Sequence, residues 1–164
     1  MFQVVVLPPP GSMGPVEELR RLHDPAFHRV AAHIALLPAF EAATAALNER
    51  FDAIAFEPFD ASLGPPAAAG SALCLPIAQG SQEMRRLTST LATSLLGPLG
   101  APPRTAPSMR VGLFGSDAEL ELARRALATL APPPPWTVRE IVLLLEDVRG
   151  LWHEVRRSAG ARGS

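Results

Sequence analysis

The sequence predicts an α+β domain built from two similar lobes around a central cleft. Predicted elements run in the order strand, helix, strand, helix, hairpin, helix, strand, helix and two strands, and the second half loosely repeats the first. The chain has 164 residues, of which 48% are hydrophobic, enough to bury the core of one domain. Two apolar runs, 32–40 and 109–114, each carry one nitrogen-bearing side chain. We expect these runs to face each other across the cleft.

The run 32–40 is predicted to be a buried strand, because Pro38 closes it too early for a helix. Alternate residues of a strand share a face. His33 and Ala35 therefore point to one side, and Ile34 points to the other. One face is core, and the other presents an imidazole followed by a small side chain.

The run 109–114 has the same layout far downstream in the chain. Arg110 and Gly112 are expected on one face of this strand, and Val111 and Leu113 on the other. The alternative to a functional role is that a lone histidine or arginine on such a strand is a core residue whose hydrogen bonds are made within the protein. For Arg110 the alternative is an ion pair with an acid such as Glu57 or Asp60, which we slightly favour over an anion clamp.

Apolar periodicity, caps and chain breakers define the remaining elements. Strands are expected at 3–7, 51–59, 72–78, 136–145 and 150–155, and helices at 16–23, 41–50 and 81–96. The turn-rich segment 64–70 is expected to close a hairpin. Ser116 and Glu119 form a capping-box pattern that starts a last helix, which ends before Pro132.

The composition argues against several classes of function. The formal net charge of −1 argues against a strongly basic nucleic-acid binder. All fifteen basic residues are arginine, and without lysine the chain has no P-loop, Schiff base or adenylyl-lysine chemistry. Cys74 is the only cysteine, so no internal disulfide forms and a zinc site is improbable. His23, His28 and His153 are expected to have surface or packing roles.

No apolar run is long enough to span a bilayer, and the N-terminal residues lack a signal-peptide pattern. We therefore expect a cytoplasmic monomer that needs no cofactor, no metal and no membrane partner.

This layout resembles the two-histidine (2H) phosphoesterase superfamily, which contains bacterial RNA 2′,5′-ligase-like proteins and cyclic phosphodiesterases. The run His33-Ile-Ala-Leu36, continued by Pro38-Ala-Phe40, is close to the His-x-Thr-Leu pattern of the first family motif. The segment 109–113 lies where the second motif is expected. The resemblance implies a bilobal 2H-phosphoesterase-like fold, with two antiparallel sheets around a central cleft and helices outside. It would cover 1–157, with 158–164 as a flexible tail.

The resemblance also implies a metal-free mechanism, in which one imidazole takes a proton and the other gives one. The chain departs from this set, since His33 is kept but Ala35 stands where a hydroxyl is expected. At the second motif, Arg110 is taken to replace the histidine and Gly112 the hydroxyl. Arginine stays protonated and cannot exchange protons, although it can bind a phosphate with two N–H groups.

The leading hypothesis is a divergent member without the full catalytic set, which binds a nucleotide or an RNA end through His33 and Arg110. A second hypothesis is a weak or altered cyclic phosphodiesterase or 2′,5′-phosphodiester enzyme, with His33 as its catalytic acid/base and Arg110 as the clamp. A third is a scaffold whose cleft is filled.

Overall fold

The computed structural model describes residues 1–97, 103 and 105–161. Its strands are β1 (Phe2–Val6), β2 (Ile34–Phe40), β3 (Phe59–Ala61), β4 (Ala67–Ala69), β5 (Ala72–Pro76), β6 (Ser108–Leu113), β7 (Trp136–Val138), β8 (Glu140–Glu146) and β9 (Trp152–Ala159). Its helices are α1 (Gly14–His23), α2 (Thr44–Asp52), α3 (Ser81–Leu91), which continues as a π-helical turn (Ala92–Leu96), and α4 (Asp117–Ala128).

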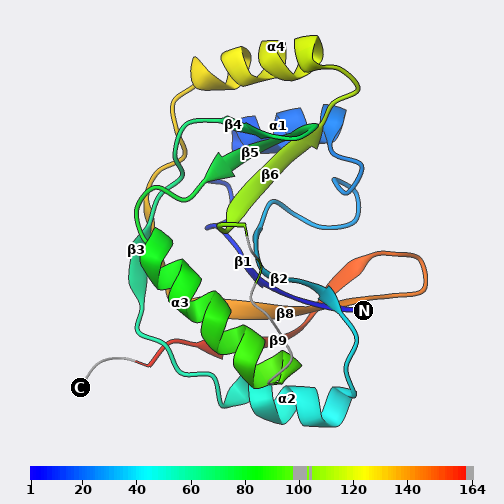
Figure 1. Cartoon of the computed structure of the whole chain (residues 1–164), viewed down its shortest axis with the longest axis vertical. Coiled ribbons are helices and arrows are strands. Elements are labelled where there is room, and N and C mark those ends of the chain that lie inside the picture. The colour runs from blue at the N-terminus through cyan, green and yellow to red at the C-terminus, as the bar shows by residue number, and fades with distance from the viewer. Residues whose placement is uncertain (98–102, 104, 162–164) are drawn as a thin grey trace.

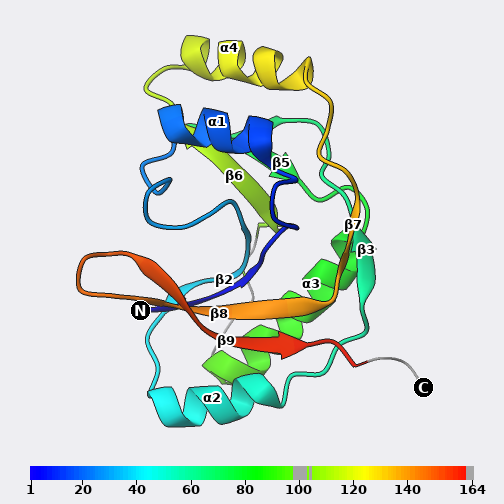
Figure 2. The same cartoon turned by 180° about the vertical axis from the view of Figure 1, so that it is seen from behind.

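The strands form two antiparallel sheets, as predicted for an α+β chain. The larger sheet has seven strands in the order β4-β5-β6-β2-β1-β8-β9, and β3 pairs with β7 in a separate ribbon. Helices α1 and α4 lie beside the half of the sheet that contains β4, β5 and β6, whereas α2 and α3 lie beside the other half (Figures 1 and 2). This arrangement gives the two lobes, with the helices outside.

β2, which begins one residue after His33, and β6, which carries Arg110, are neighbours in one sheet. This corrects the expectation that the two strands face each other across a cleft. β2 pairs with β6 at a single position, Ile34 opposite Met109, and both side chains are fully buried. On their other sides β2 pairs with β1 and β6 pairs with β5. The two lobes are therefore joined through this short pairing.

Two predicted strands and one predicted loop differ from the structure. The segment 64–70, expected to be the loop of a hairpin, contains β4, which pairs with β5. Residues 51–59 were expected to form one strand, but α2 runs to Asp52 because Leu47 and Phe51, four residues apart, share its buried face. Of the predicted strand only Phe59 lies in a strand, as the first residue of β3. The strand expected over 136–145 is divided at Arg139. Its first part pairs with β3 and its second part pairs with β1 and β9, so one segment serves both sheets.

The C-terminal segment is ordered further than expected. β9 continues to Ala159, two residues into the predicted tail, and the backbone N–H of Gly160 donates to the Arg139 carbonyl at 2.7 Å. Of the tail, residues 162–164 lie outside the described part of the chain. The domain extent of 1–157 stays a prediction. In the described ranges, none of the helices has the length and apolar character needed to cross a membrane.

Candidate functional site

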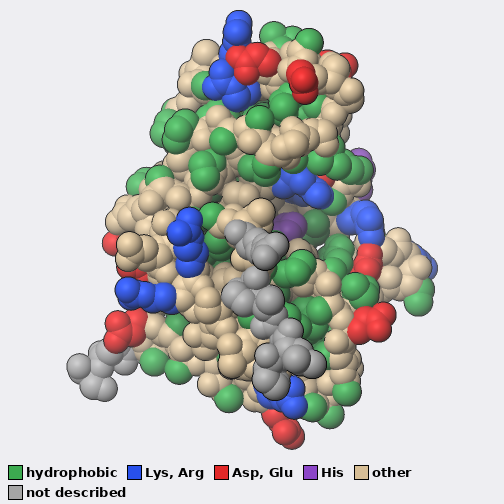
Figure 3. Space-filling model, viewed as in Figure 1, with side chains coloured by type: hydrophobic (Ala, Val, Ile, Leu, Met, Phe, Trp, Pro, Cys, Tyr) green, Lys and Arg blue, Asp and Glu red, His purple; other side chains and the backbone are tan. Residues whose placement is uncertain are grey.

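A pocket opens at the junction of the two lobes, beside the β2–β6 pairing. Because Ile34 lies opposite Met109 in this antiparallel pair, His33 lies opposite Arg110 and Ala35 lies opposite Ser108. All four residues line the same pocket of about 270 Å³. Its other lining residues are Gln3, Arg20, Asp24, Ala26, Arg29 and Trp152. The space-filling view shows a hollow on this face, with a histidine side chain between arginines (Figure 3).

His33 lies one residue before β2 and is held in one tautomer. Its Nδ1 lies 2.8 Å from the Ala31 carbonyl oxygen. A carbonyl oxygen only accepts, so Nδ1 carries the hydrogen and Nε2 of the neutral ring keeps a lone pair. Burial, together with the charges of Arg20 and Arg110, lowers the pKa of His33, against opposing effects of the Ala31 carbonyl and Asp24. The imidazole is therefore a neutral base near pH 7.

Arg110 forms an ion pair with Asp24, an acid that the sequence did not indicate. Its Nη2 donates to Oδ1 of Asp24 at 3.0 Å, whereas the predicted partners were Glu57 or Asp60. Asp60 instead accepts a hydrogen bond from Thr137. Asp24 is buried, but the Arg110 side chain is 45% exposed. Its other guanidinium nitrogens have no protein partner among the described residues, so they can contact a ligand.

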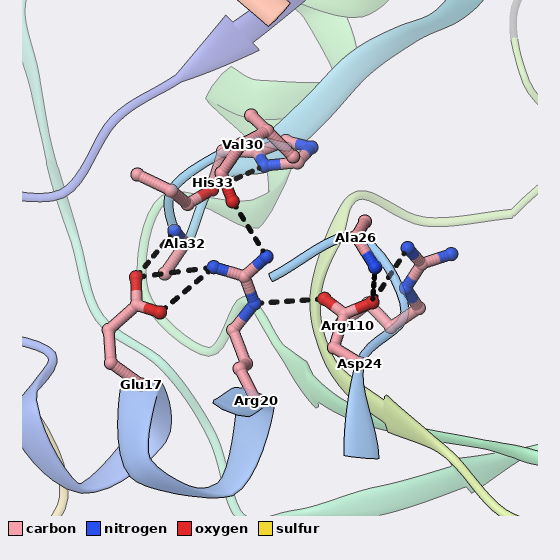
Figure 4. Close-up of polar contacts among 9 residues, drawn as sticks. Glu17, Arg20, Asp24, Ala26, Val30, Ala32, His33 and Arg110 are labelled. Atoms are coloured by element: carbon pink, nitrogen blue, oxygen red, sulfur yellow. Dashed lines mark hydrogen bonds and ion pairs between the residues drawn. The ribbon is translucent and has the colours of Figure 1, made fainter. Parts of the chain in front are cut away.

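A buried arginine on α1 organises the base of the pocket, and sequence analysis did not identify it. Arg20 is 1% exposed, and its Nε donates to Asp24 at 2.9 Å. Its Nη1 donates to Glu17 at 3.0 Å and its Nη2 to the Val30 carbonyl at 2.9 Å (Figure 4). Glu17 also accepts from the backbone N–H of Ala32 at 2.6 Å. The acid–base–acid spacing of 17, 20 and 24, with one helical turn between neighbours, was the signal that could have revealed this cluster.

The pocket lining carries excess positive charge. Three arginines line it, but Asp24 is the one acid among its lining residues. Glu17 pairs with Arg20 and Glu146 pairs with Arg29, yet neither glutamate lines the pocket. A lining of this kind favours an anionic ligand, which replaces water at the exposed guanidinium groups.

Gly112 was expected to occupy a position at the site, but it packs against α1. A Cβ atom added to Gly112 would lie 2.7 Å from Cβ of His23, so the missing side chain lets β6 approach the helix closely. The other three histidines do not line the pocket. His23 packs on Phe114 with ring centres 4.6 Å apart, and His153 pairs with Asp147.

No group of three or more His, Cys, Asp or Glu side chains suited to a metal ion occurs within residues 1–97, 103 and 105–161. The residues that line the described pocket offer anion binding by arginine and proton exchange at one imidazole.

We expect His33 to titrate below its ordinary pKa of 6.5 and a bound dianion to raise that pKa. Sulfate stays doubly charged between about pH 5 and 8, whereas His33 gains its charge only as the pH falls through its lowered pKa. Sulfate should therefore bind more tightly at about pH 5.5 than at about pH 7.5. NMR titration of the imidazole and calorimetry at both pH values measure these effects. An unchanged pH dependence in His33→Gln would assign the effect to another group.

A family model described as the 2'-5' RNA ligase superfamily matches residues 8–150. No curated protein sequence matches the chain. Among solved structures, Escherichia coli LigT complexed with NADP+ superposes with a TM-score of 0.72 at 18% identity, covering 98% of this chain and 97% of that one. LigT complexed with 3'-AMP gives a TM-score of 0.70 at 17% identity, covering 98% of both chains.

A third similar structure is TT0787 of Thermus thermophilus, with a TM-score of 0.62 at 16% identity and 96% of both chains covered. At these identities the structural likeness demonstrates the fold, and the family model, which spans most of the chain, demonstrates the relationship. The chain belongs to the 2'-5' RNA ligase superfamily, the 2H phosphoesterases that its sequence resembles.

Proposed function

We propose that this protein is a divergent 2H phosphoesterase that binds a phosphate-containing ligand, a nucleotide or an RNA end, in the pocket beside the β2–β6 pairing. The observation that carries the proposal is that His33 and Arg110 line one pocket and that the Arg110 side chain is 45% exposed. Arg110 would donate to the phosphate oxygens while Asp24 holds its other edge.

The rest of the lining supports a nucleotide rather than a bare anion. Trp152, on the first position of β9, offers an aromatic surface beside the polar groups, on which a base can stack. LigT, which has the same fold, has been crystallised with NADP+ and with 3'-AMP.

Binding without efficient turnover fits the composition of the pocket. His33 is the only imidazole among its lining residues, and the neighbouring positions carry Ala35, Ser108 and Arg110. Loss of one positioned acid or base lowers a rate by about 10²–10⁴-fold. The second candidate function, a weak phosphodiesterase, is favoured by the Nε2 lone pair of the neutral His33, which can accept a proton. The open pocket favours both over a filled scaffold. A cytoplasmic location and a monomeric state stay predictions.

Arg110→Ala should weaken phosphate binding by about 10- to 100-fold, because each charged hydrogen bond contributes about 1.5–3 kcal/mol. Its effect on the unfolding free energy should stay below about 1 kcal/mol, since Asp24 keeps its bonds to Arg20 and to the Ala26 N–H. Calorimetric titration with phosphate and with a nucleoside 2′-phosphate measures both affinities. A higher affinity for the nucleotide supports the aromatic contact.

The matched control is Arg125→Ala, which removes an exposed arginine of α4 that pairs with Glu121 away from the pocket. Equal affinities in wild type, Arg110→Ala and Arg125→Ala would overturn the binding proposal. Hydrolysis of nucleoside 2′,3′-cyclic phosphates and 2′,5′-linked dinucleotides, run beside His33→Ala, tests the second candidate. Turnover that disappears in His33→Ala would establish weak catalysis by the single histidine.

A further inference from the structure

We infer that Arg20 is a positioning residue that places both ligand-binding side chains, His33 and Arg110, through two separate chains of hydrogen bonds from α1. The inference rests on the proposed function for its ligand. It assigns a role to a residue that is 1% exposed and whose three guanidinium nitrogens all donate to protein groups.

The first chain runs from Arg20 to Arg110 through Asp24. Nε of Arg20 donates to Oδ2 of Asp24 at 2.9 Å, and Oδ1 accepts from Nη2 of Arg110 at 3.0 Å (Figure 4). Oδ1 also accepts from the Ala26 backbone N–H at 3.0 Å. With both oxygens bonded and 2% of its side chain exposed, Asp24 has one orientation, which fixes the edge of Arg110 that it contacts.

The second chain runs from Arg20 to the segment before His33. Nη2 of Arg20 donates to the Val30 carbonyl, and Nη1 holds Glu17, which accepts from the Ala32 N–H at 2.6 Å. The carbonyl that receives the Nδ1 hydrogen of His33 belongs to Ala31, between these two anchored residues. By fixing the backbone on both sides of Ala31, these hydrogen bonds set both the position and the tautomer of the His33 imidazole.

Arginine is the side chain that this geometry requires. The three nitrogens of Arg20 donate in three directions from one rigid plane, to a carboxylate on each side and to a carbonyl. Lysine keeps the charge but has no planar fork. A role limited to anchoring α1 would change stability alone, whereas positioning also changes ligand affinity and the surroundings of His33.

The test compares Arg20→Lys with Arg21→Lys, whose arginine contacts Glu18 on the exposed face of the same helix. Arg20→Lys should weaken phosphate binding at least tenfold and shift the His33 imidazole resonances, while Arg21→Lys leaves both unchanged. The losses caused by His33→Ala and Arg110→Ala should both shrink in the Arg20→Lys background, because coupled residues are not additive. A folded Arg20→Lys with wild-type affinity and wild-type His33 resonances would overturn the inference.

Glu17→Ala, with Glu18→Ala as its control, provides a second test should Arg20→Lys fail to fold. It removes the Glu17 link of the second chain and no bond of the first, so the loss caused by His33→Ala should shrink while that caused by Arg110→Ala stays complete. Wild-type affinity and resonances in Glu17→Ala would also count against the inference. If the wild type does not bind phosphate, the proposed function fails, and the His33 resonances still report whether Arg20 positions the imidazole.

Discussion

Ser108→His should raise the turnover of a nucleoside 2′,3′-cyclic phosphate by about 10²-fold or more over the wild type. A local twofold axis through the Ile34–Met109 pair maps His33 onto Ser108 and Ala35 onto Arg110. Since the resemblance implies one His-x-Thr/Ser motif on each strand, we propose that Ser108 occupies the place of the second histidine and Arg110 that of the hydroxyl. This placement differs from the sequence-based assignment, which put Arg110 in place of the histidine and Gly112 in place of the hydroxyl, and Gly112 does not line the pocket.

The matched variant is Arg110→His, which places an imidazole at the position that sequence analysis assigned to the second motif. It should give no such gain, since it also removes one of the two arginines bound to Asp24. Adding His33→Ala to Ser108→His should abolish the new activity. A gain from Arg110→His as large as that from Ser108→His would refute the proposed placement. Steady-state hydrolysis rates of the wild type and these variants decide whether Ser108 or Arg110 occupies the position of the second histidine.

Arg20→Met should lower the free energy of unfolding by about 3–5 kcal/mol, the usual effect of breaking a buried ion pair. Methionine fills much of the space but leaves Glu17 and the buried Asp24 without Arg20, and Asp24 keeps only Arg110 as its cation. Arg21→Met, one residue further along the exposed face, should change stability by less than about 1 kcal/mol. Chemical denaturation of both variants measures the difference.

Asp24→Asn provides the control for that prediction. If the cost of Arg20→Met comes from an uncompensated charge on Asp24, the double variant Arg20→Met/Asp24→Asn should be less destabilised than the sum of the two single variants. Strict additivity, or equal losses in Arg20→Met and Arg21→Met, would show that the buried Arg20–Asp24 ion pair does not stabilise the protein as predicted.

Local signals in the sequence determined most of the secondary structure. The capping box at Ser116 starts α4 as expected, with the Ser116 hydroxyl accepting from the Glu119 N–H. The alternation of apolar residues identified β2 and β6, and with them His33 and Arg110, because side-chain period and chain breakers act within a few residues. The α+β class and the superfamily also followed from the sequence.

Tertiary structure alone decided how those residues work together. The single β2–β6 pairing at Ile34 and Met109 brings Ser108 into the pocket, and close packing of Gly112 against α1 keeps that glycine out of it. The partner of Arg110 is Asp24, 86 residues away in the chain. Register between distant strands and the choice among many acids for one arginine depend on contacts that form only when the whole core closes, so no local pattern specifies them.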